Sequence, residues 1–513
     1  MGSTGLVPLE AFRRLIARRS RGLLELAAFI AASSPGPRCF TRPLLGDVLS
    51  EATQLEELLD AYGVRHNRRW HPLRQAVAAL KLFSNASYIL LHLLHFLPTY
   101  RLLPLEADFV GAAREALEFT CRVLGDTARN LLSTARALRL PPTQAPPPER
   151  FADELPDGRL PADRGNHQAA SPGETVVYLA TAFLNLAEEA RFLHVAQVQQ
   201  PDGYAGLIPD PLSEERLRSL EQKFHNLQSV YDTHISDSNL ESLDERLPVL
   251  RGHISVTYHL LETATAFAHY WERHLLSLSP EARRREPVEA APLLEVLVRF
   301  SLAFASRYIL AARTLGHEML RRYAVPGRID VPVPRYRGFH VRPSTLVARI
   351  VGHYGSEVVM ELEGELYNAG VTLDLFRANE KISAGKKRRL TEEVHRRLGS
   401  QPPDQPGAGP PAAWARGVVQ DLFACNRLVL YQRDFALQEE QPRPGELPEE
   451  FVTRALLELF LAGKIDVIVE LSACFRGDRR VLEDIRLLAE NGYGEDDFGN
   501  NLALPERLQY LRK

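Results

Sequence analysis

The chain has 513 residues, of which 45% are apolar and 25% are charged, and its formal net charge at pH 7 is −3. The length predicts about three domains, and the near-neutral charge argues against a nucleic-acid partner or a basic membrane anchor. Four cysteines without metal-ligand or redox-motif spacing indicate a reducing, cytoplasmic compartment: Cys39, Cys121, Cys425 and Cys474.

The amino-terminal part is predicted to be helical. Apolar residues recur there at steps of three and four, as in Leu55, Leu58 and Leu59, which predicts a helical domain over residues 1–140. Prolines mixed with Asp, Gly and Ser then predict a linker or long loop over residues 141–173.

Helical periodicity resumes over residues 174–198, 214–230, 251–276 and 292–323, which predicts a bundle of long antiparallel helices over residues 174–326. Two stretches, residues 79–100 and 292–315, are apolar enough to raise the question of a membrane. They contain Lys81 and Arg299 among other polar residues that are costly at a bilayer centre. We therefore expect buried helices and no membrane span.

The pattern changes near Arg328. Residues 329–334 and 358–362 are rich in β-formers and bounded by turn residues, and Glu363-Gly364 predicts a turn into a third short strand at Leu366-Tyr367-Asn368. A helix over residues 343–354 has Leu346, Ile350 and Val351 on one face, which a sheet would cover. A small α+β unit is the predicted result.

A histidine loop, Gly338-Phe339-His340-Val341-Arg342-Pro343-Ser344-Thr345, lies between the first strand and this helix. A phosphoryl-accepting histidine needs an exposed ring nitrogen and positive surroundings. Pro343 suits the first turn of a helix, so Pro343, Ser344 and Thr345 are the candidate phosphate-binding turn beside His340. Arg342 adds a fork of donors suited to phosphate.

The strand, the Gly-Phe-His-Val-Arg-Pro loop, the helix, the second strand, the turn and Asn368-Ala369 together resemble the first two-thirds of HPr, the bacterial phosphocarrier protein. Residues 463–470 resemble its missing last strand, and residues 481–495 resemble its closing helix and tail. The predicted fold is mainly α with one small α+β domain. That domain is an HPr-like open-faced β-sandwich over residues 327–382 plus 463–498, split by a helical insertion at 383–462 and followed by a tail at 499–513.

The resemblance implies a phosphohistidine protein that needs no cofactor. His340 would accept a phosphoryl group from an Enzyme I-like donor charged by phosphoenolpyruvate, and Arg342 would hold the phosphate. Phe339 and Phe376 lie where the family has a partner-contact surface. Because so much helix is attached, we interpret the chain as a phosphotransfer or phosphorylation-sensing regulatory protein of a bacterial phosphotransferase system, whose downstream target the sequence does not reveal.

Three alternatives stay open. The HPr shape can serve as a non-catalytic docking scaffold, with the helical region as a ligand- or partner-binding module. The basic cluster from His66 to His71 is either a receiver for a phosphorylated partner loop or a solvated helix end. Acidic and histidine side chains of the bundle would be metal ligands only if the helices bring them together: Glu188, Glu189, His194, His259, Glu262, His269, Glu272 and His274.

Two further patterns limit the function. The run Lys386-Lys387-Arg388-Arg389, followed by Glu392 and Glu393, predicts a solvated helix start rather than a nucleic-acid contact. No Gly-rich phosphate loop, Gly-x-Ser-x-Gly elbow or His-Glu-x-x-His occurs, which argues against a self-contained ATPase, hydrolase or zinc protease.

Overall fold

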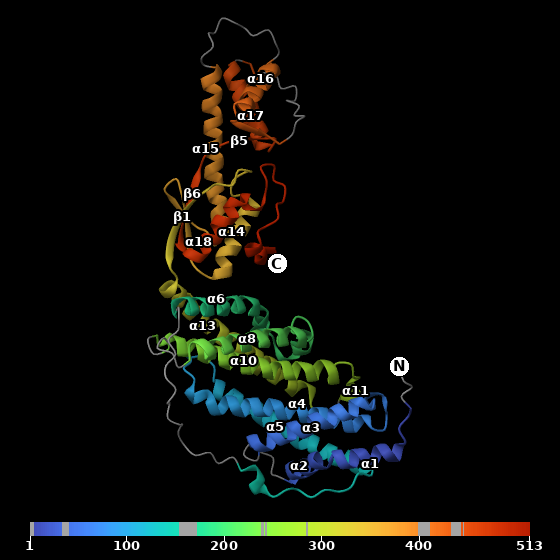
Figure 1. The fold of residues 1–513 in the computed structure, drawn as a ribbon. Helices are drawn as coiled ribbons and strands as arrows, with labels where there is room; N and C mark the ends of the chain where they lie inside the picture. The colour runs from blue at the N-terminus through green and yellow to red at the C-terminus, as the bar shows by residue number, and fades with distance from the viewer. Residues whose placement is uncertain are drawn as a thin grey trace. The chain divides into compact units, whose positions relative to one another are not determined.

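The structure is a computed structural model that describes residues 5–32, 40–152, 172–236, 241, 244–283, 286–398, 411–431, 443–444 and 446–512. The chain divides into two compact units, Met1–Met319 and Leu320–Lys513, and each is described by itself. Both units are mainly helical, as the sequence predicts, and a small antiparallel sheet lies in the second (Figure 1).

The first unit consists of helices packed on one another. Its long helices are α1 (Leu9–Arg19), α2 (Arg21–Ala32), α3 (Arg42–Ala61), α4 (His71–Phe96), α5 (Phe109–Ala137), α6 (Pro172–Glu189), α8 (Glu214–His234), α10 (Arg246–Tyr270) and α13 (Ala303–Tyr323). Its shorter ones are α7 (Val195–Val198), α11 (Pro280–Arg283), α12 (Ala290–Glu295) and two π-helical segments, η7 (Trp271–Leu275) and η8 (Val296–Leu302). Thr41, Asp108 and Ser213 cap α3, α5 and α8 by accepting a first-turn N–H.

The two apolar stretches of this unit lie in its helical interior. Leu80, Phe83 and Leu90 of α4 are buried, as are Leu297 and Leu302 of η8. Among the described residues, His71–Thr99 is the helix long and apolar enough to cross a membrane by length and composition. Of its most apolar window, 61% is buried inside the protein.

The sheet of the second unit has the strand order β1-β6-β2-β3, and all its pairings are antiparallel. Its strands are β1 (Pro326–Pro332), β2 (Val358–Leu362), β3 (Glu365–Asn368) and β6 (Ser472–Asp478). Ile329, Met360 and Phe475 point into the core from one face, against α14 (Val341–Tyr354) and α18 (Arg479–Glu490). The predicted strands at 329–334 and 358–362 and the helix at 343–354 are confirmed to within three residues.

The predicted last strand is wrong. Within residues 463–470 only β5 (Ile465–Val467) is a strand, and it pairs with β4 (Leu428–Leu430) in a separate two-stranded sheet. The strand that lies between β1 and β2 is β6, which begins at Ser472, so residues 463–467 belong with the insertion and not with the sheet. The physical reason lies in the side-chain pattern: all three β5 residues are buried, whereas β6 places Ala473 and Phe475 on the core face and Arg476 on the outer face.

The insertion is joined to the sheet-bearing part by one continuous helix, α15 (Thr372–Leu398). Ile382 of α15 belongs to the core under the sheet, whereas Leu390 and Val394 belong to a second core with α16 (Pro411–Ala424) and α17 (Pro448–Leu461). In Figure 1, α15 runs from beside the sheet up to the cluster of α16 and α17. The predicted helix start at 386–389 is wrong, because these residues lie inside α15 and Lys386 is buried, whereas Arg388 and Arg389 are exposed as a solvated run would be.

Candidate functional site

Two consecutive residues with left-handed backbone precede His340. Arg337 has a φ of 52° and Gly338 a φ of 64°, and only the second is a residue that adopts this conformation at little cost. The Arg337 conformation is held from the insertion: its N–H donates to an Asp466 carboxylate oxygen at 3.2 Å, and its guanidinium donates to the Gly463 carbonyl at 3.1 Å. The histidine loop therefore has its shape fixed partly by residues more than 120 positions later.

His340 lies at the start of α14, as predicted, as its N-cap residue. Its Nδ1 is 3.2 Å from the Gly338 carbonyl oxygen, and its Nε2 is 3.2 Å from the Glu495 carboxylate. Because a carbonyl and a carboxylate both accept hydrogen bonds, a proton on either ring nitrogen of His340 has an acceptor facing it. The His340 side chain is 24% exposed, so one side of the ring remains reachable.

Glu495 is the residue that the sequence did not single out. Its side chain is only 4% exposed, and its second oxygen has no hydrogen-bond partner among the described residues. Burial raises the pKa of the Glu495 carboxyl, while the charges of His340 and Arg342 act in the opposite direction. A carboxyl with a raised pKa beside an imidazole is suited to exchange a proton with it.

Arg342 is half-buried in the first turn of α14. Its Nε lies against Gly494, the neighbour of Glu495, and is itself buried without a hydrogen-bond partner in the described part of the chain. Because this N–H is enclosed by the protein, an oxyanion would reach it only after a local shift of the loop.

The candidate phosphate-binding turn uses most of its polar groups internally. Pro343 is the third residue of α14 and has no N–H, and the Ser344 N–H donates to the His340 carbonyl. The Ser344 and Thr345 hydroxyls donate to the carbonyls of Phe339 and Val341. By helix geometry, the first-turn N–H groups without an intrahelical acceptor are those of Val341 and Arg342.

The two candidate partner-contact phenylalanines lie differently. Phe339 is fully buried and packs against Phe475 and Tyr493, which removes its side chain from any partner surface. Phe376 is partly buried on α15. Val341, the residue after His340, is 67% exposed.

A buried ion pair links the histidine loop to the insertion. Both Asp466 oxygens lie 2.8 Å from the Lys386 Nζ, and the two side chains are 5% and 4% exposed. Asp466 also accepts from the Tyr431 hydroxyl at 3.2 Å, and burial followed by Asp466 raises the pKa of that phenol. Tyr336 completes the link, since its ring meets those of both Tyr431 and His340 edge-on.

No protein-family model, curated protein or solved structure matches this chain.

The described side chains considered as metal ligands come together at most in pairs, as His259 and Glu262 do. The nearest ring or side-chain partners are the Ser306 hydroxyl for His194, Glu262 for His259 and Gln75 for His274. Over the described ranges, no group of three His, Cys, Asp or Glu side chains is placed to hold a metal ion.

Proposed function

We propose that the second unit is an HPr-like domain, split by an insertion, in which His340 accepts a phosphoryl group from an Enzyme I-like donor. The observation that carries the proposal is the position of His340 at the start of α14, two residues before Arg342, whose Nε has no hydrogen-bond partner among the described residues. The order of elements supports it: strand, helix, strand, strand, helix, then after the insertion a strand and a helix. Among the described residues, α14, α15 and α18 pack on one face of the sheet, the arrangement that an open-faced sandwich would have.

Transfer of a phosphoryl group to His340 requires an unprotonated ring nitrogen. Where both ring nitrogens carry a proton, Glu495 can take up the one on Nε2, 3.2 Å away, whereas the Gly338 carbonyl can take up none. As the bond between phosphorus and the donor breaks, a bond forms between phosphorus and a nitrogen of His340. The proton retained by Glu495 then prevents a carboxylate from facing the new phosphate, and the burial of Glu495 favours this neutral form.

Phosphorylation adds a charge of about −2 to the loop. Arg342 and the open first-turn N–H groups of α14 stabilise that charge, whereas an ionised Glu495 opposes it. Because the same loop is bonded to Asp466 and Gly463, a shift of its backbone changes the contacts of the insertion. The chain is thus a phosphorylation-sensing regulatory protein in which the insertion responds to the state of His340.

The test is to incubate the full chain with phosphoenolpyruvate and Enzyme I and to measure acid-labile phosphate. Wild type gains phosphate, and His340→Ala gains none. His395→Ala is the matched control, because His395 is an exposed histidine of the same unit that pairs with Glu449 on the insertion. Glu495→Gln gains phosphate more slowly, since glutamine cannot take the ring proton. Phosphate that persists in His340→Ala, or that never appears in wild type, contradicts the proposal.

One observation favours the alternative of a non-catalytic docking scaffold: both ring nitrogens of His340 already face acceptors. In that case the His340–Glu495 contact is structural, and His340→Ala leaves capture of an Enzyme I-like partner unchanged. Pull-down of Enzyme I by wild type and His340→Ala, without phosphoenolpyruvate, separates the two functions.

A further inference from the structure

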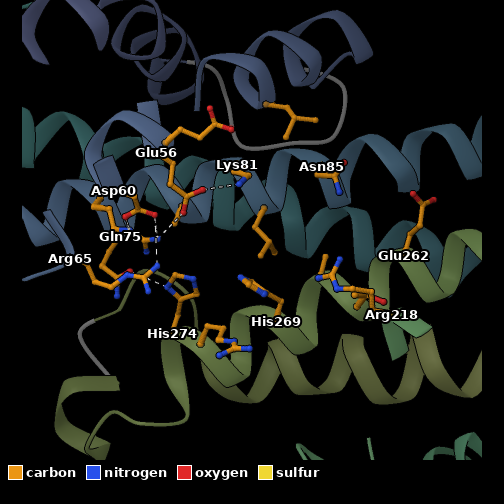
Figure 2. A pocket seen from close by; sticks show the side chains of 18 of the residues that line it. Glu56, Asp60, Arg65, Gln75, Lys81, Asn85, Arg218, Glu262, His269 and His274 are labelled. Atoms are coloured by element: carbon orange, nitrogen blue, oxygen red, sulfur yellow. Dashed lines mark hydrogen bonds and ion pairs between the residues drawn. The ribbon is translucent and has the colours of Figure 1, made fainter. Parts of the chain in front are cut away.

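A large cavity of about 820 Å³ lies in the first unit, and its lining carries five arginine or lysine side chains and five carboxylates (Figure 2). Its cations are neutralised within the walls: Lys81 lies 2.8 Å from Glu56, and Arg74 donates to Asp60 at 2.8 Å. Because these four side chains come from α3 and α4, which pack on each other, both pairs are fixed parts of the wall. The histidine loop differs, because a separate segment brings carboxylates to its positive groups.

A short hairpin after α18 lies beside the histidine loop. It is formed by residues 494–504, here called the strap, and the Leu502 N–H donates to the Gly494 carbonyl across it at 2.9 Å. Asp496 closes its turn by accepting from the Asn500 backbone N–H and side-chain amide, both at 2.8 Å. The strap therefore keeps its shape through hydrogen bonds of its own.

The strap places acidic side chains against the cations of the histidine loop. Glu495 lies 3.2 Å from the His340 Nε2, and Asp497 lies 3.3 Å from the Arg335 guanidinium. The positive charge of Arg342 also acts on Glu495, because it opposes the burial that raises the pKa of that carboxyl. A phosphoryl group on His340 would be stabilised by the same positive charges.

The strap also closes the approach to the loop. Gly494 lies so close to α14 that a Cβ there would be 3.5 Å from the Arg342 Nε. Near the tip of the hairpin, a Cβ on Gly499 would lie 2.6 Å from the Tyr336 ring, which itself meets the His340 ring edge-on. Only backbone without a side chain approaches so closely. An incoming oxyanion therefore reaches the Arg342 Nε when the strap is displaced.

An anchor, η10 (Glu506–Arg512), holds the far end of the strap. Its Leu508 is buried in the core under the sheet. The Tyr510 hydroxyl donates to the buried Asp484 of α18 at 2.7 Å, and the Arg507 Nε lies 2.7 Å from the other Asp484 oxygen. Because these polar contacts share one carboxylate, removing one of them loosens the anchor without taking an apolar side chain from the core.

We propose that the strap is an intrachain competitor of the phosphoryl group: when closed it occupies the positive charges of the histidine loop, and it swings out for a donor to reach His340. This inference rests on the proposed phosphotransfer. Once Glu495 has taken up the ring proton, the charge-assisted contact that holds the strap is lost, which releases it. The phosphoryl group then adds a charge of about −2 that repels the remaining acidic residues of the strap. By linkage, whatever opens the strap favours phosphorylation, and phosphorylation keeps the strap open.

The test measures access to His340 separately from phosphotransfer, in the full chain. Diethyl pyrocarbonate acylates unprotonated imidazole, and mass spectrometry gives the labelling rate of His340 against exposed His395 as the internal reference. Tyr510→Phe removes one hydrogen bond of the anchor and should label about tenfold faster or more, the factor that corresponds to one hydrogen bond to a charged group. Gly499→Ala should act in the same direction, because its Cβ pushes the hairpin off the Tyr336 ring. Both variants should also gain phosphate faster from phosphoenolpyruvate and Enzyme I.

Each variant has a matched control in the same unit. Tyr367→Phe removes a tyrosine hydroxyl that donates to a carboxylate, Glu365, at 2.7 Å on β3. Gly364→Ala introduces a Cβ at the same φ of 82° as Gly499, but that Cβ meets no atom within 4 Å. Both controls should label His340 and gain phosphate like wild type.

The outcomes separate the strap from the phosphotransfer. Equal labelling of His340 in wild type, Tyr510→Phe and Gly499→Ala overturns the strap, whether or not phosphate is transferred. Faster labelling with slower gain of phosphate also overturns it, because the strap would then assist the donor instead of competing with it. Faster labelling without phosphate in any chain, wild type included, contradicts the phosphotransfer and supports the strap as the cover of His340.

Discussion

Replacing Asp466 by asparagine removes the carboxylate that Lys386 contacts with both oxygens at 2.8 Å. The Lys386 side chain is 4% exposed, so its ammonium would remain buried without a counter-charge. Breaking a buried pair in this way costs about 3–5 kcal/mol. The loss falls on the region that Asp466 holds together: α15, β5 and the loop at Arg337.

Hydrogen exchange of the full chain measures this loss locally, which avoids treating a two-unit protein as a single two-state transition. Where opening of the region limits exchange, 3–5 kcal/mol corresponds to exchange faster by a factor of roughly 100 to 4,000. The Arg337 amide, which donates to Asp466, and the α15 amides around Lys386 should show it. Amides of α4 and α5 in the other unit should not change.

Two variants make the result interpretable. Glu449→Gln removes an exposed ion pair with His395 on the same insertion and should cost less than about 1 kcal/mol. The double variant Lys386→Met with Asp466→Asn removes the stranded charge and should recover at least half of the loss. If Asp466→Asn speeds hydrogen exchange as little as Glu449→Gln does, the buried pair does not hold the loop to the insertion. The same follows if the stability lost in the double variant equals the sum of the losses in the Asp466→Asn and Lys386→Met single variants.

Three further outcomes follow from the structure. Gly338→Ala should destabilise the second unit by about 1–2 kcal/mol in urea unfolding, because the φ of Gly338 is 64° and a new Cβ would meet Asn379. Gly352→Ala, where the helix leaves space for a Cβ, should instead stabilise the unit by up to about 1 kcal/mol. Equal effects of the two variants would contradict the left-handed turn at Gly338. Burial lowers the pKa of both His253 and His274 to about 4, from an ordinary value of 6.5. Between these values the unfolded state binds more protons than the folded state, so the unfolding free energy of the first unit should fall by about 3 kcal/mol per histidine as the pH drops from 6.5 to 4. An unfolding free energy that stays constant over this pH range would refute the prediction. Asp478→Ala should lower the unfolding free energy by about 2 kcal/mol, seen as a lower melting temperature, because Asp478 caps α18 and accepts a hydrogen bond from Ser356. Asp330 is an exposed aspartate of the same unit, and Asp330→Ala should change the melting temperature little.

The local elements near the histidine were predictable because their signals are short-range. Pro343 in a first turn, the apolar stripe at Leu346 and Ile350, and the Glu363-Gly364 turn each indicate structure within a few residues. The helices of the first unit follow from periodicity for the same reason.

The last strand was misassigned because two strand-like runs follow one another and local pattern does not choose between them. Residues 465–467 look more like a strand than 472–478, but the first run pairs with Leu428–Leu430, a three-residue strand without a visible turn signal. The run that enters the main sheet is the one that pairs with β1 and β2, which lie more than 100 residues earlier in the sequence.

The candidate site was found only in part. His340 and Arg342 belong to one motif, whereas Glu495 and Asp466 reach the loop from more than 120 residues away. A lone glutamate after a helix and a lone aspartate in a strand carry no signal of a partner in a single sequence. The burial of Lys386 was likewise hidden, because a basic run inside a helix ordinarily faces water.

The 27 residues of α15, at 1.5 Å each, make a rod of about 40 Å that carries two hydrophobic cores on one backbone. A rod of this kind resists bending and twisting over its length, so the insertion has no flexible joint at its entry point. Force applied to the insertion, for example by a bound partner, is therefore delivered to the sheet-bearing part as torque along α15. A single-molecule pulling experiment with handles on α17 and α18 should accordingly see both cores fail together, instead of in two separate rips.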